Sequence, residues 1–208
     1  MEAVVDRRAG RMSGAEFRAF QDTRPDYERW ELVAGVAMMM TPPTIAHQRI
    51  AGNLERLLND CLEHHVPSMV ATQRPGLDLA SGDYRPEPDV GVIDADYAPD
   101  QHYVEKAYLL AEVVSSTDHV GVPGSTDRWI DVKRNLYRSH RHCEAVLIIE
   151  QDRMEVGIDL RTPDGWTSSV ASGAGAEIVI PEFGFRCFVS DLYEGTPLAP
   201  RPTAQRRP

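Results

Sequence analysis

Two carboxylates stand beside or inside apolar runs that are typical of β-strands. Asp89 opens the run DVGVI within PEPDVGVI (residues 86–93), and Glu112 lies near the end of AYLLAEVV (residues 107–114). A glutamate is almost never fully buried unless it has a partner. If the two runs form neighbouring strands, the two acids meet at one end of a sheet and repel each other unless a cation lies between them.

A divalent cation would resolve this repulsion. Mg²⁺ takes oxygen ligands from one or two carboxylates, keeps several waters and can bridge to substrate phosphates. A metal-bound water becomes an acidified nucleophile, and the cation neutralises the charge that develops on the phosphate. A lysine nearby would stabilise that charge or help to deprotonate the water. The two acids are therefore compatible with an Mg²⁺ (or Mn²⁺) site that acts on a phosphate, although a raised pKa of one acid would also relieve the repulsion.

Each residue also has a simpler explanation when it is taken alone. Aspartate after proline is common in turns, so Asp89 needs no chemical role. Glu112 fits an edge strand or an ion pair equally well. His47 opens a predicted helix, where it either contacts a phosphate or an acid of the site or faces solvent.

Several elements must position these residues. Ser13 and Glu16 have the spacing of a capping box, which predicts a short helix over residues 13–21. Residues 28–40 predict a β-hairpin that turns at Ala34 and Gly35. From residue 45 to about residue 63, apolar residues recur at helical spacing and predict a long amphipathic helix.

The rest of the chain predicts strands, with two further helices among them. The strand-like segments are SMVAT, GLDLA, DVGVI, AYLLAEVV, AVLIIE, MEVGIDL, WTSSVAS and EIVI. A helix is expected over residues 126–139 and a short one around residues 189–193. This order predicts a mixed α/β fold (α+β-like) in which helices flank a central mixed sheet, with an N-terminal hairpin and extra C-terminal strands.

The composition fits a single domain of a cytoplasmic protein. The 208 residues are 42% hydrophobic and 26% charged, which is enough for a sizeable core. We expect one domain over residues 1–195 and a disordered tail, rich in proline and basic residues, over residues 196–208. No run is long and apolar enough to span a membrane, no signal peptide is recognised, and the cysteines are too scattered for a disulfide framework.

Taken in order, the motifs resemble one protein family. The series is WELVAGVAMMMTPP, HQRI, RPEPDVGVI, YLLAEVVSSTD, DVKRNLY and AVLIIE, and it runs from about residue 27 to about residue 150. It is similar to the Uma-two (Uma2) family, which is classed with restriction endonucleases in the PD-(D/E)xK nuclease superfamily. The resemblance implies a restriction-endonuclease-like core and a metal-dependent nuclease that acts on DNA.

The resemblance also assigns roles to individual residues. It makes Asp89 and Glu112 the two metal-binding acids, and the backbone carbonyl of Val113 a further metal ligand. Glu31 in WELVAG matches an early glutamate of the family, which implies another metal ligand or a supporting acid.

The lysine of the site is expected at an unusual place. The superfamily's usual position, two residues after the second acid, holds Val114 in this chain. In the family the lysine falls on the following helix, which corresponds to Lys133, and its long flexible side chain can reach the site from there. Tyr137 lies one helical turn after Lys133 and either lines the same face or packs in the core.

Two classes of function are compatible with these observations. One is an endonuclease that hydrolyses DNA, in which a homodimer, common in the superfamily, would let two sites cut two strands. The other is a non-catalytic module of the same fold that binds nucleic acid or protein. The net charge of −10 argues against a general basic surface for nucleic acid. The retained set of Asp89, Glu112 and Lys133 favours the enzyme.

Overall fold

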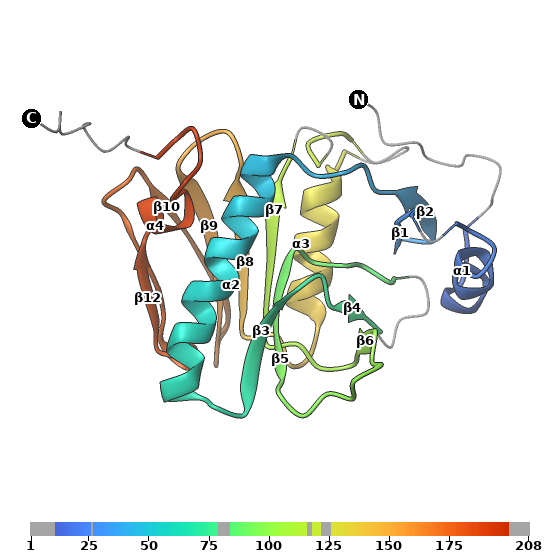
Figure 1. Ribbon diagram of the computed structural model, residues 1–208, viewed down its shortest axis with the longest axis horizontal. Helices are drawn as coiled ribbons and strands as arrows, with labels where there is room; N and C mark the ends of the chain where they lie inside the picture. The colour runs from blue at the N-terminus through green and yellow to red at the C-terminus, as the bar shows by residue number, and fades with distance from the viewer. Residues whose placement is uncertain (1–10, 26, 79–83, 116–117, 122–125, 200–208) are drawn as a thin grey trace, which may run out of the picture.

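The centre of the computed structural model is a six-stranded mixed sheet (Figure 1). The structure describes residues 11–25, 27–78, 84–115, 118–121 and 126–199. The strands follow the order β10–β9–β8–β7–β5–β3; β7 and β8 are parallel, and the other neighbours are antiparallel. Their bounds are Met69–Gln73 (β3), Val90–Asp94 (β5), Leu109–Val114 (β7), Ala145–Glu150 (β8), Glu155–Thr162 (β9) and Gly165–Ser172 (β10). The predicted mixed α/β fold is confirmed.

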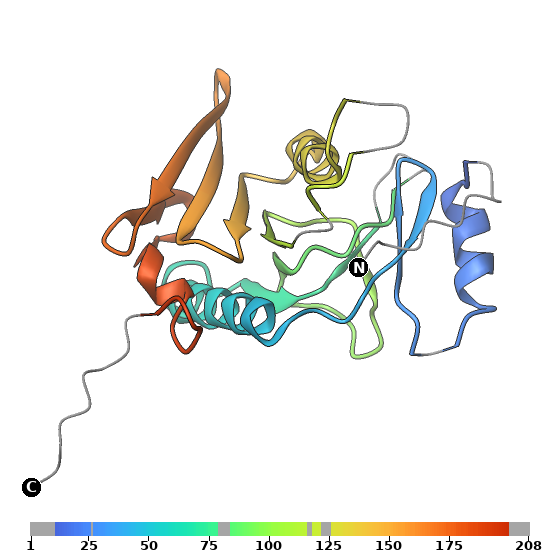
Figure 2. The ribbon, with the colours of Figure 1, turned by 90° about the horizontal axis from the view of Figure 1, so that it is seen from above.

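Helices cover both faces of this sheet (Figure 2). The α-helices are Gly14–Gln21 (α1), Ile45–His65 (α2), Trp129–Ser139 (α3) and Val189–Leu192 (α4). Ala111 and Val113 of β7 belong to the core beneath α2, whereas Leu110 packs with residues of α3. Because side chains alternate across a strand, Glu112 points to the same face as Leu110 and therefore toward α3.

The predicted N-terminal helix and hairpin are both present. Ser13 caps α1 in the capping box that its spacing predicts. β1 (Trp30–Val33) and β2 (Val36–Met39) pair in antiparallel orientation. The turn between them has a φ of 51° at Ala34 and of 75° at Gly35, the positive values that a two-residue hairpin turn requires.

The hairpin is attached to the central sheet through the segment that precedes β5. Leu32 and Arg85 exchange two backbone hydrogen bonds, of 3.3 and 2.8 Å. Further along this segment, the amide of Glu87 donates to the Glu31 carboxylate at 3.2 Å. These contacts bring β1 beside the end of β5 at which Asp89 lies.

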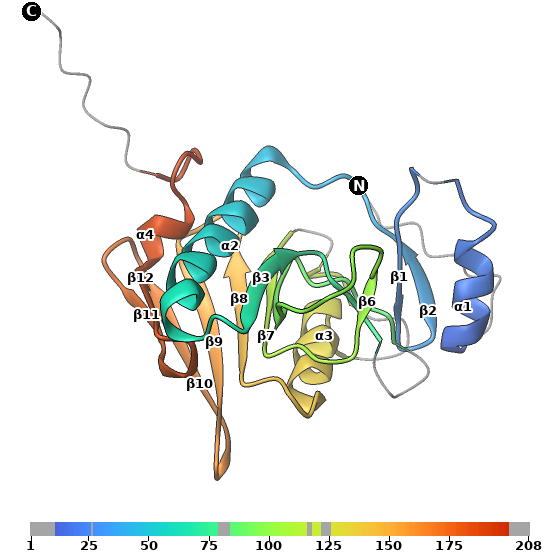
Figure 3. The same ribbon diagram turned by 60° about the horizontal axis from the view of Figure 1, so that its bottom comes forward.

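The C-terminal strands pack on the α2 side of the molecule (Figure 3). β11 (Glu177–Ile180) and β12 (Phe185–Phe188) form a hairpin, which a 3₁₀ turn (Pro181–Phe183) connects. β12 was not predicted, because its four residues are too few to show a clear alternation. A second strand that was not predicted, β6 (Tyr103–Val104), is only two residues long and pairs with β4 (Gly76–Leu77).

The structure bears on two predicted boundaries, the start of the helix over residues 126–139 and the start of the tail at residue 196. α3 begins at Trp129 and not at residue 126, because Arg128 has an extended backbone and pairs with Asp131 at 2.8 Å as the helix cap. The predicted tail covers residues 196–208, of which residues 200–208 lie outside the described part of the chain. Within the described part, Thr196 is buried and its hydroxyl donates to the carbonyl of Tyr193 at 2.7 Å.

None of the helices within the described residues is long and apolar enough to cross a bilayer. The division into a domain over residues 1–195 and a tail stays a prediction.

Gly91 permits a close contact that shapes the neighbourhood of Asp89. It lies two residues after Asp89 in β5, and a Cβ atom at this position would stand 2.8 Å from Cγ of Pro75. So short a contact forces the proline ring and the backbone beside it to move. We expect Gly91→Ala to lower the free energy of unfolding by about 1–3 kcal/mol, measured by urea denaturation.

Gly157→Ala in β9 is the matched control. A Cβ atom there would meet Ile148 at 3.6 Å, an ordinary van der Waals distance. Alanine also restricts the unfolded chain, so we expect this variant to be neutral or up to about 1 kcal/mol more stable than the wild type. Equal losses in the two variants would show that the contact with Pro75 is not the cause.

Candidate active site

Glu112 meets a lysine from α3 inside the protein. The ammonium nitrogen of Lys133 lies 3.2 Å from Oε1 and 3.3 Å from Oε2 of Glu112. The same nitrogen lies 2.9 Å from Oε2 of Glu31. None of these three side chains is more than 5% exposed. The structure therefore places one buried ammonium group between two buried carboxylates.

Tyr137 holds Glu112 from the next turn of α3. It lies four residues after Lys133, so both side chains project from one face of the helix. Its ring is fully buried, and its hydroxyl donates a short hydrogen bond to Oε1 of Glu112. Tyr137 thus packs in the core and contacts the acid as well.

The register of the sheet places Asp89 opposite Glu112. Val90 pairs with Ala111 at the end of the β5–β7 ladder, so one residue further along, Asp89 stands opposite Glu112. Beyond this last pair, the amide of Val113 donates to Oδ2 of Asp89 at 2.8 Å. In a strand, the N–H and C=O of one residue point to the same side. The carbonyl of Val113 therefore faces the gap that Asp89 borders.

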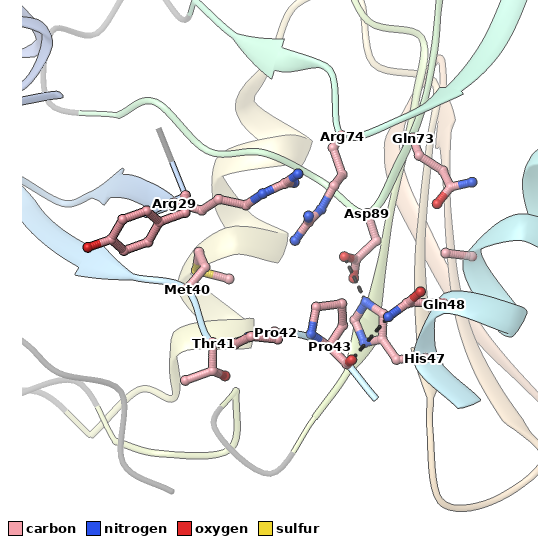
Figure 4. A pocket seen from close by; sticks show the side chains of 12 residues that line it. Arg29, Met40, Thr41, Pro42, Pro43, His47, Gln48, Gln73, Arg74 and Asp89 are labelled. Atoms are coloured by element: carbon pink, nitrogen blue, oxygen red, sulfur yellow. Dashed lines mark hydrogen bonds and ion pairs between the residues drawn. The ribbon is translucent and has the colours of Figure 1, made fainter. Parts of the chain in front are cut away.

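His47 binds Asp89 from the other side. It lies in the first turn of α2, where the hydroxyl of the capping residue Thr44 accepts from its amide at 3.1 Å. Its Nε2 lies 2.9 Å from Oδ1 of Asp89, and Figure 4 shows the imidazole reaching toward this carboxylate. The sequence allowed His47 either to face solvent or to contact a phosphate or an acid of the site. In the structure it contacts an acid, Asp89.

Two residues of the site were not identified from the sequence. Glu87 lies between two prolines and was given no role, but its amide binds Glu31 and its side chain lines the same cavity. The sequence did contain one sign of its role, since Glu87 is a further acid only two residues before Asp89. Arg74 follows β3 and also lines the cavity. An arginine at the end of a strand has no sequence signature that separates it from a surface residue.

These acids border a cavity of about 280 Å³. Its wall contains the side chains of Glu31, Glu87, Asp89 and Glu112 together with Val113. Lys133 is not among the described residues that line it, because the lysine lies behind the two glutamates that it binds. The wall of the cavity therefore carries four carboxylates beside Arg74 and His47, and the Lys133 ammonium group lies behind two of them.

Burial decides the protonation of the inner acids. It raises the pKa of Glu31, and it raises the pKa of Glu112 well above the ordinary value, while the charge of Lys133 opposes both changes. Burial alone would lower the pKa of Lys133, but Glu112 and Glu31 outweigh it and raise that pKa well above its usual range. Lys133 is therefore an ammonium ion at neutral pH and cannot act as a base. Burial and the charge of Glu31 also raise the pKa of Glu87.

The oxygen donors at this site are of the kind that Mg²⁺ takes. Among the described residues, no group of three or more His, Cys, Asp and Glu side chains could hold a metal ion. Mg²⁺ needs fewer protein ligands, because it keeps several waters and takes one or two carboxylates. Oxygen donors come from Asp89, Glu112 and Val113. In addition, Oε2 of Glu31 has no hydrogen bond of normal geometry within the described residues, although Lys133 lies 2.9 Å away.

This fold and these motifs match known proteins. A family model named Uma2, described as "Putative restriction endonuclease", matches residues 15–189. The chain belongs to the Uma2 family. The family predicted from the motifs is thus confirmed, and family and fold together indicate a restriction-endonuclease-like nuclease whose substrate is a nucleic acid.

A solved structure shares the fold of this Uma2 protein. It is a crystal structure from Anabaena variabilis ATCC 29413, described as a putative nuclease belonging to DUF820. The TM-score is 0.64 at 14% sequence identity, and the match covers 88% of this chain and 97% of the other. At this identity the likeness shows the fold alone. No curated protein matches the chain at a significant level.

Loss of Lys133 should destabilise the Uma2 chain strongly. Lys133→Met leaves Glu31 and Glu112 buried without a counter-charge, so we expect the free energy of unfolding to fall by about 3–5 kcal/mol. The loss should grow as the pH rises above the ordinary glutamate pKa of about 4.3, because the two acids then ionise in the unfolded chain while burial keeps them protonated in the folded one. Urea denaturation between acidic and neutral pH, without divalent cations, measures both effects.

Two further variants test the cause of that loss. Adding Glu31→Gln to Lys133→Met should restore part of the stability, because one buried charge is removed. Lys106→Met is the control, since Lys106 forms an exposed ion pair with Asp94 at 3.4 Å. Such surface pairs contribute up to about 1 kcal/mol. A loss as large for Lys106 as for Lys133 would contradict the role of burial.

Proposed function

We propose that this protein is an Mg²⁺-dependent endonuclease that hydrolyses phosphodiester bonds of DNA. The observation that supports it most is the convergence of Glu31, Asp89 and Glu112 on one cavity, with the Lys133 ammonium buried behind two of them. Desolvating charged groups costs several kcal/mol for each ion, and apolar side chains would fill the same space at lower cost. The charges are thus better explained by chemistry than by stability.

Asp89, Glu112 and the carbonyl of Val113 would hold the cation, with waters completing its coordination. When bound, the cation supplies an acidified water as the nucleophile and neutralises charge on the phosphate. Mn²⁺ is expected to bind the same oxygen donors.

The protein's own residues prepare this site. Lys133 favours the ionised form of Glu31 and Glu112 and so opposes the burial that raises the pKa of both acids. Tyr137 and His47 fix the orientation of the carboxylates of Glu112 and Asp89 by one hydrogen bond each. Preorganised charges of this kind lower the barrier because they need no rearrangement during the reaction.

One such site cuts one strand. Cleavage of both strands of a duplex would follow from a homodimer, in which the second chain supplies the second site. The number of strands cut therefore depends on the assembly as well as on the residues described above.

The test is cleavage of supercoiled plasmid and of linear duplex DNA with Mg²⁺ or Mn²⁺. Asp89→Asn and Glu112→Gln keep the size of the side chains but remove the charge that binds the cation. We expect each to lower the cleavage rate by at least about a hundredfold. A chelator such as EDTA should abolish cleavage by the wild type.

Glu177→Gln serves as the control, because Glu177 forms an exposed ion pair with Arg186 in the C-terminal hairpin. It should cut DNA at the rate of the wild type. Circular dichroism confirms that each variant is folded. Cleavage that survives both Asp89→Asn and Glu112→Gln would rule out this site. A folded wild type that binds DNA but never cuts it would favour the non-catalytic binding module.

A further inference from the structure

Two arginine side chains converge at the open end of the site. Arg29 precedes β1 and Arg74 follows β3, so they come from distant parts of the sequence. Both line a cavity of about 360 Å³ that also includes His47 and Asp89. Figure 4 shows their guanidinium groups pointing toward one another, close to the carboxylate of Asp89.

The guanidinium groups of Arg29 and Arg74 lie near one acid, Glu87, whose pKa their charges lower. In the part of the chain that the structure describes, the side chains of Arg29 and Arg74 make no ion pair and no hydrogen bond. Two like charges repel each other, so their convergence is unfavourable unless an anion joins them. The planar fork of a guanidinium group matches phosphate oxygens in particular.

The backbone of Arg74 gives independent support. Its φ is +57°, a left-handed conformation that disfavours every residue with a Cβ atom. Its amide donates to the carbonyl of Asp89 at 3.3 Å, which ties the strained residue to the site. Ala34 has a similar φ, but a hairpin turn explains it. At position 74, glycine would be the favourable residue for the backbone, so the arginine is explained by what its side chain does.

We propose that Arg29 and Arg74 form a subsite for a backbone phosphate of the nucleic acid, adjacent to the phosphate that is cut. This inference rests on the proposed nuclease function. The cavity of the arginines and the cavity of the acids share Arg74, His47 and Asp89, so a strand that crosses Asp89 also passes the guanidinium groups. A chain with a net charge of −10 needs such a local positive site to attract a polyanion.

Binding to a fluorescently labelled DNA duplex tests the subsite separately from cleavage. Fluorescence anisotropy is measured over a series of salt concentrations, with Ca²⁺ in place of Mg²⁺ to prevent cutting. Arg29→Ala and Arg74→Ala should each weaken binding by about tenfold. Each should also reduce the slope of log K against log salt by about one, because one phosphate contact is lost.

Two more variants separate binding from folding. Arg74→Gly removes the side chain and relieves the left-handed backbone, so it should bind as weakly as Arg74→Ala while its melting temperature equals or exceeds that of the wild type. Arg186→Ala changes the net charge equally but lies in the C-terminal hairpin, paired with Glu177. Its affinity and its salt slope should match those of the wild type.

Several results would overturn the subsite. Glu87 lies nearby and is half-buried, and the charges of Arg74 and Arg29 oppose the rise of its pKa that burial causes. If the arginines only balance this acid, their variants will lose thermal stability and keep the wild-type salt slope. Inorganic phosphate alone should bind far more weakly than the duplex. Equal affinity for the two would mean that the subsite serves a free anion.

The two proposals can fail separately. A wild type that never cuts DNA, but whose binding depends on both arginines, would refute the catalytic proposal and leave the subsite in place. A wild type that cuts DNA, with binding that is insensitive to both arginines, would refute the subsite and leave the catalytic proposal in place.

Discussion

The site depends on a single buried charge, the ammonium group of Lys133. Burial raises the pKa of both Glu31 and Glu112, so without a cation these acids would tend to take up protons and lose their value as ligands. Lys133 opposes that tendency at distances of 2.9 and 3.2 Å. Because these three residues belong to β1, β7 and α3, one interaction fixes how the hairpin, the sheet and the helix meet.

The sheet imposes the second constraint. Antiparallel pairing of β5 with β7 ends at Val90, and the next amide along β7, that of Val113, binds the side chain of Asp89 instead of a backbone carbonyl. The acid therefore takes a place at the end of the ladder that its register dictates. His47 then binds Asp89 from α2. The two faces of the sheet thus each supply one anchor, Lys133 for Glu112 and His47 for Asp89.

The sequence could reveal the acids but not the contacts between them. Glu112 was conspicuous because charge inside an apolar strand is costly, and Asp89 because it opens the neighbouring strand-like run. Lys133 could not be found from spacing, since Val114 holds the usual position, and it was placed only through the resemblance to the family. Tyr137 was ambiguous, because one helical face can serve the core and the site together, as it does here.

Other features left little signal in the sequence. Glu87 is a further acid near Asp89, but it lies between prolines, where an acid is unremarkable, and its partial burial follows from the way the hairpin folds over that segment. The left-handed backbone of Arg74 could not be predicted, because only glycine is a common sign of that conformation. The helices and long strands were predictable from periodicity, whereas β6 and β12 were not, since strands of two and four residues are too short to show a clear period.

The position of Lys133 also explains how a lysine on a helix can serve a site in which Val114 holds the usual lysine position. Each carboxylate has about four lone-pair positions, and Lys133 and Tyr137 do not use all those of Glu112. Glu112 lines the cavity, so in the proposed function it would bind a cation while the lysine stays behind it. In a buried environment, the charge of the ammonium group acts through the carboxylate, because the low dielectric transmits it. Direct contact between the lysine and the phosphate is then unnecessary. The proposed role requires only that the ammonium group lie next to Glu112. A lysine at position 133 of α3 meets this requirement as well as one at position 114 of β7 would.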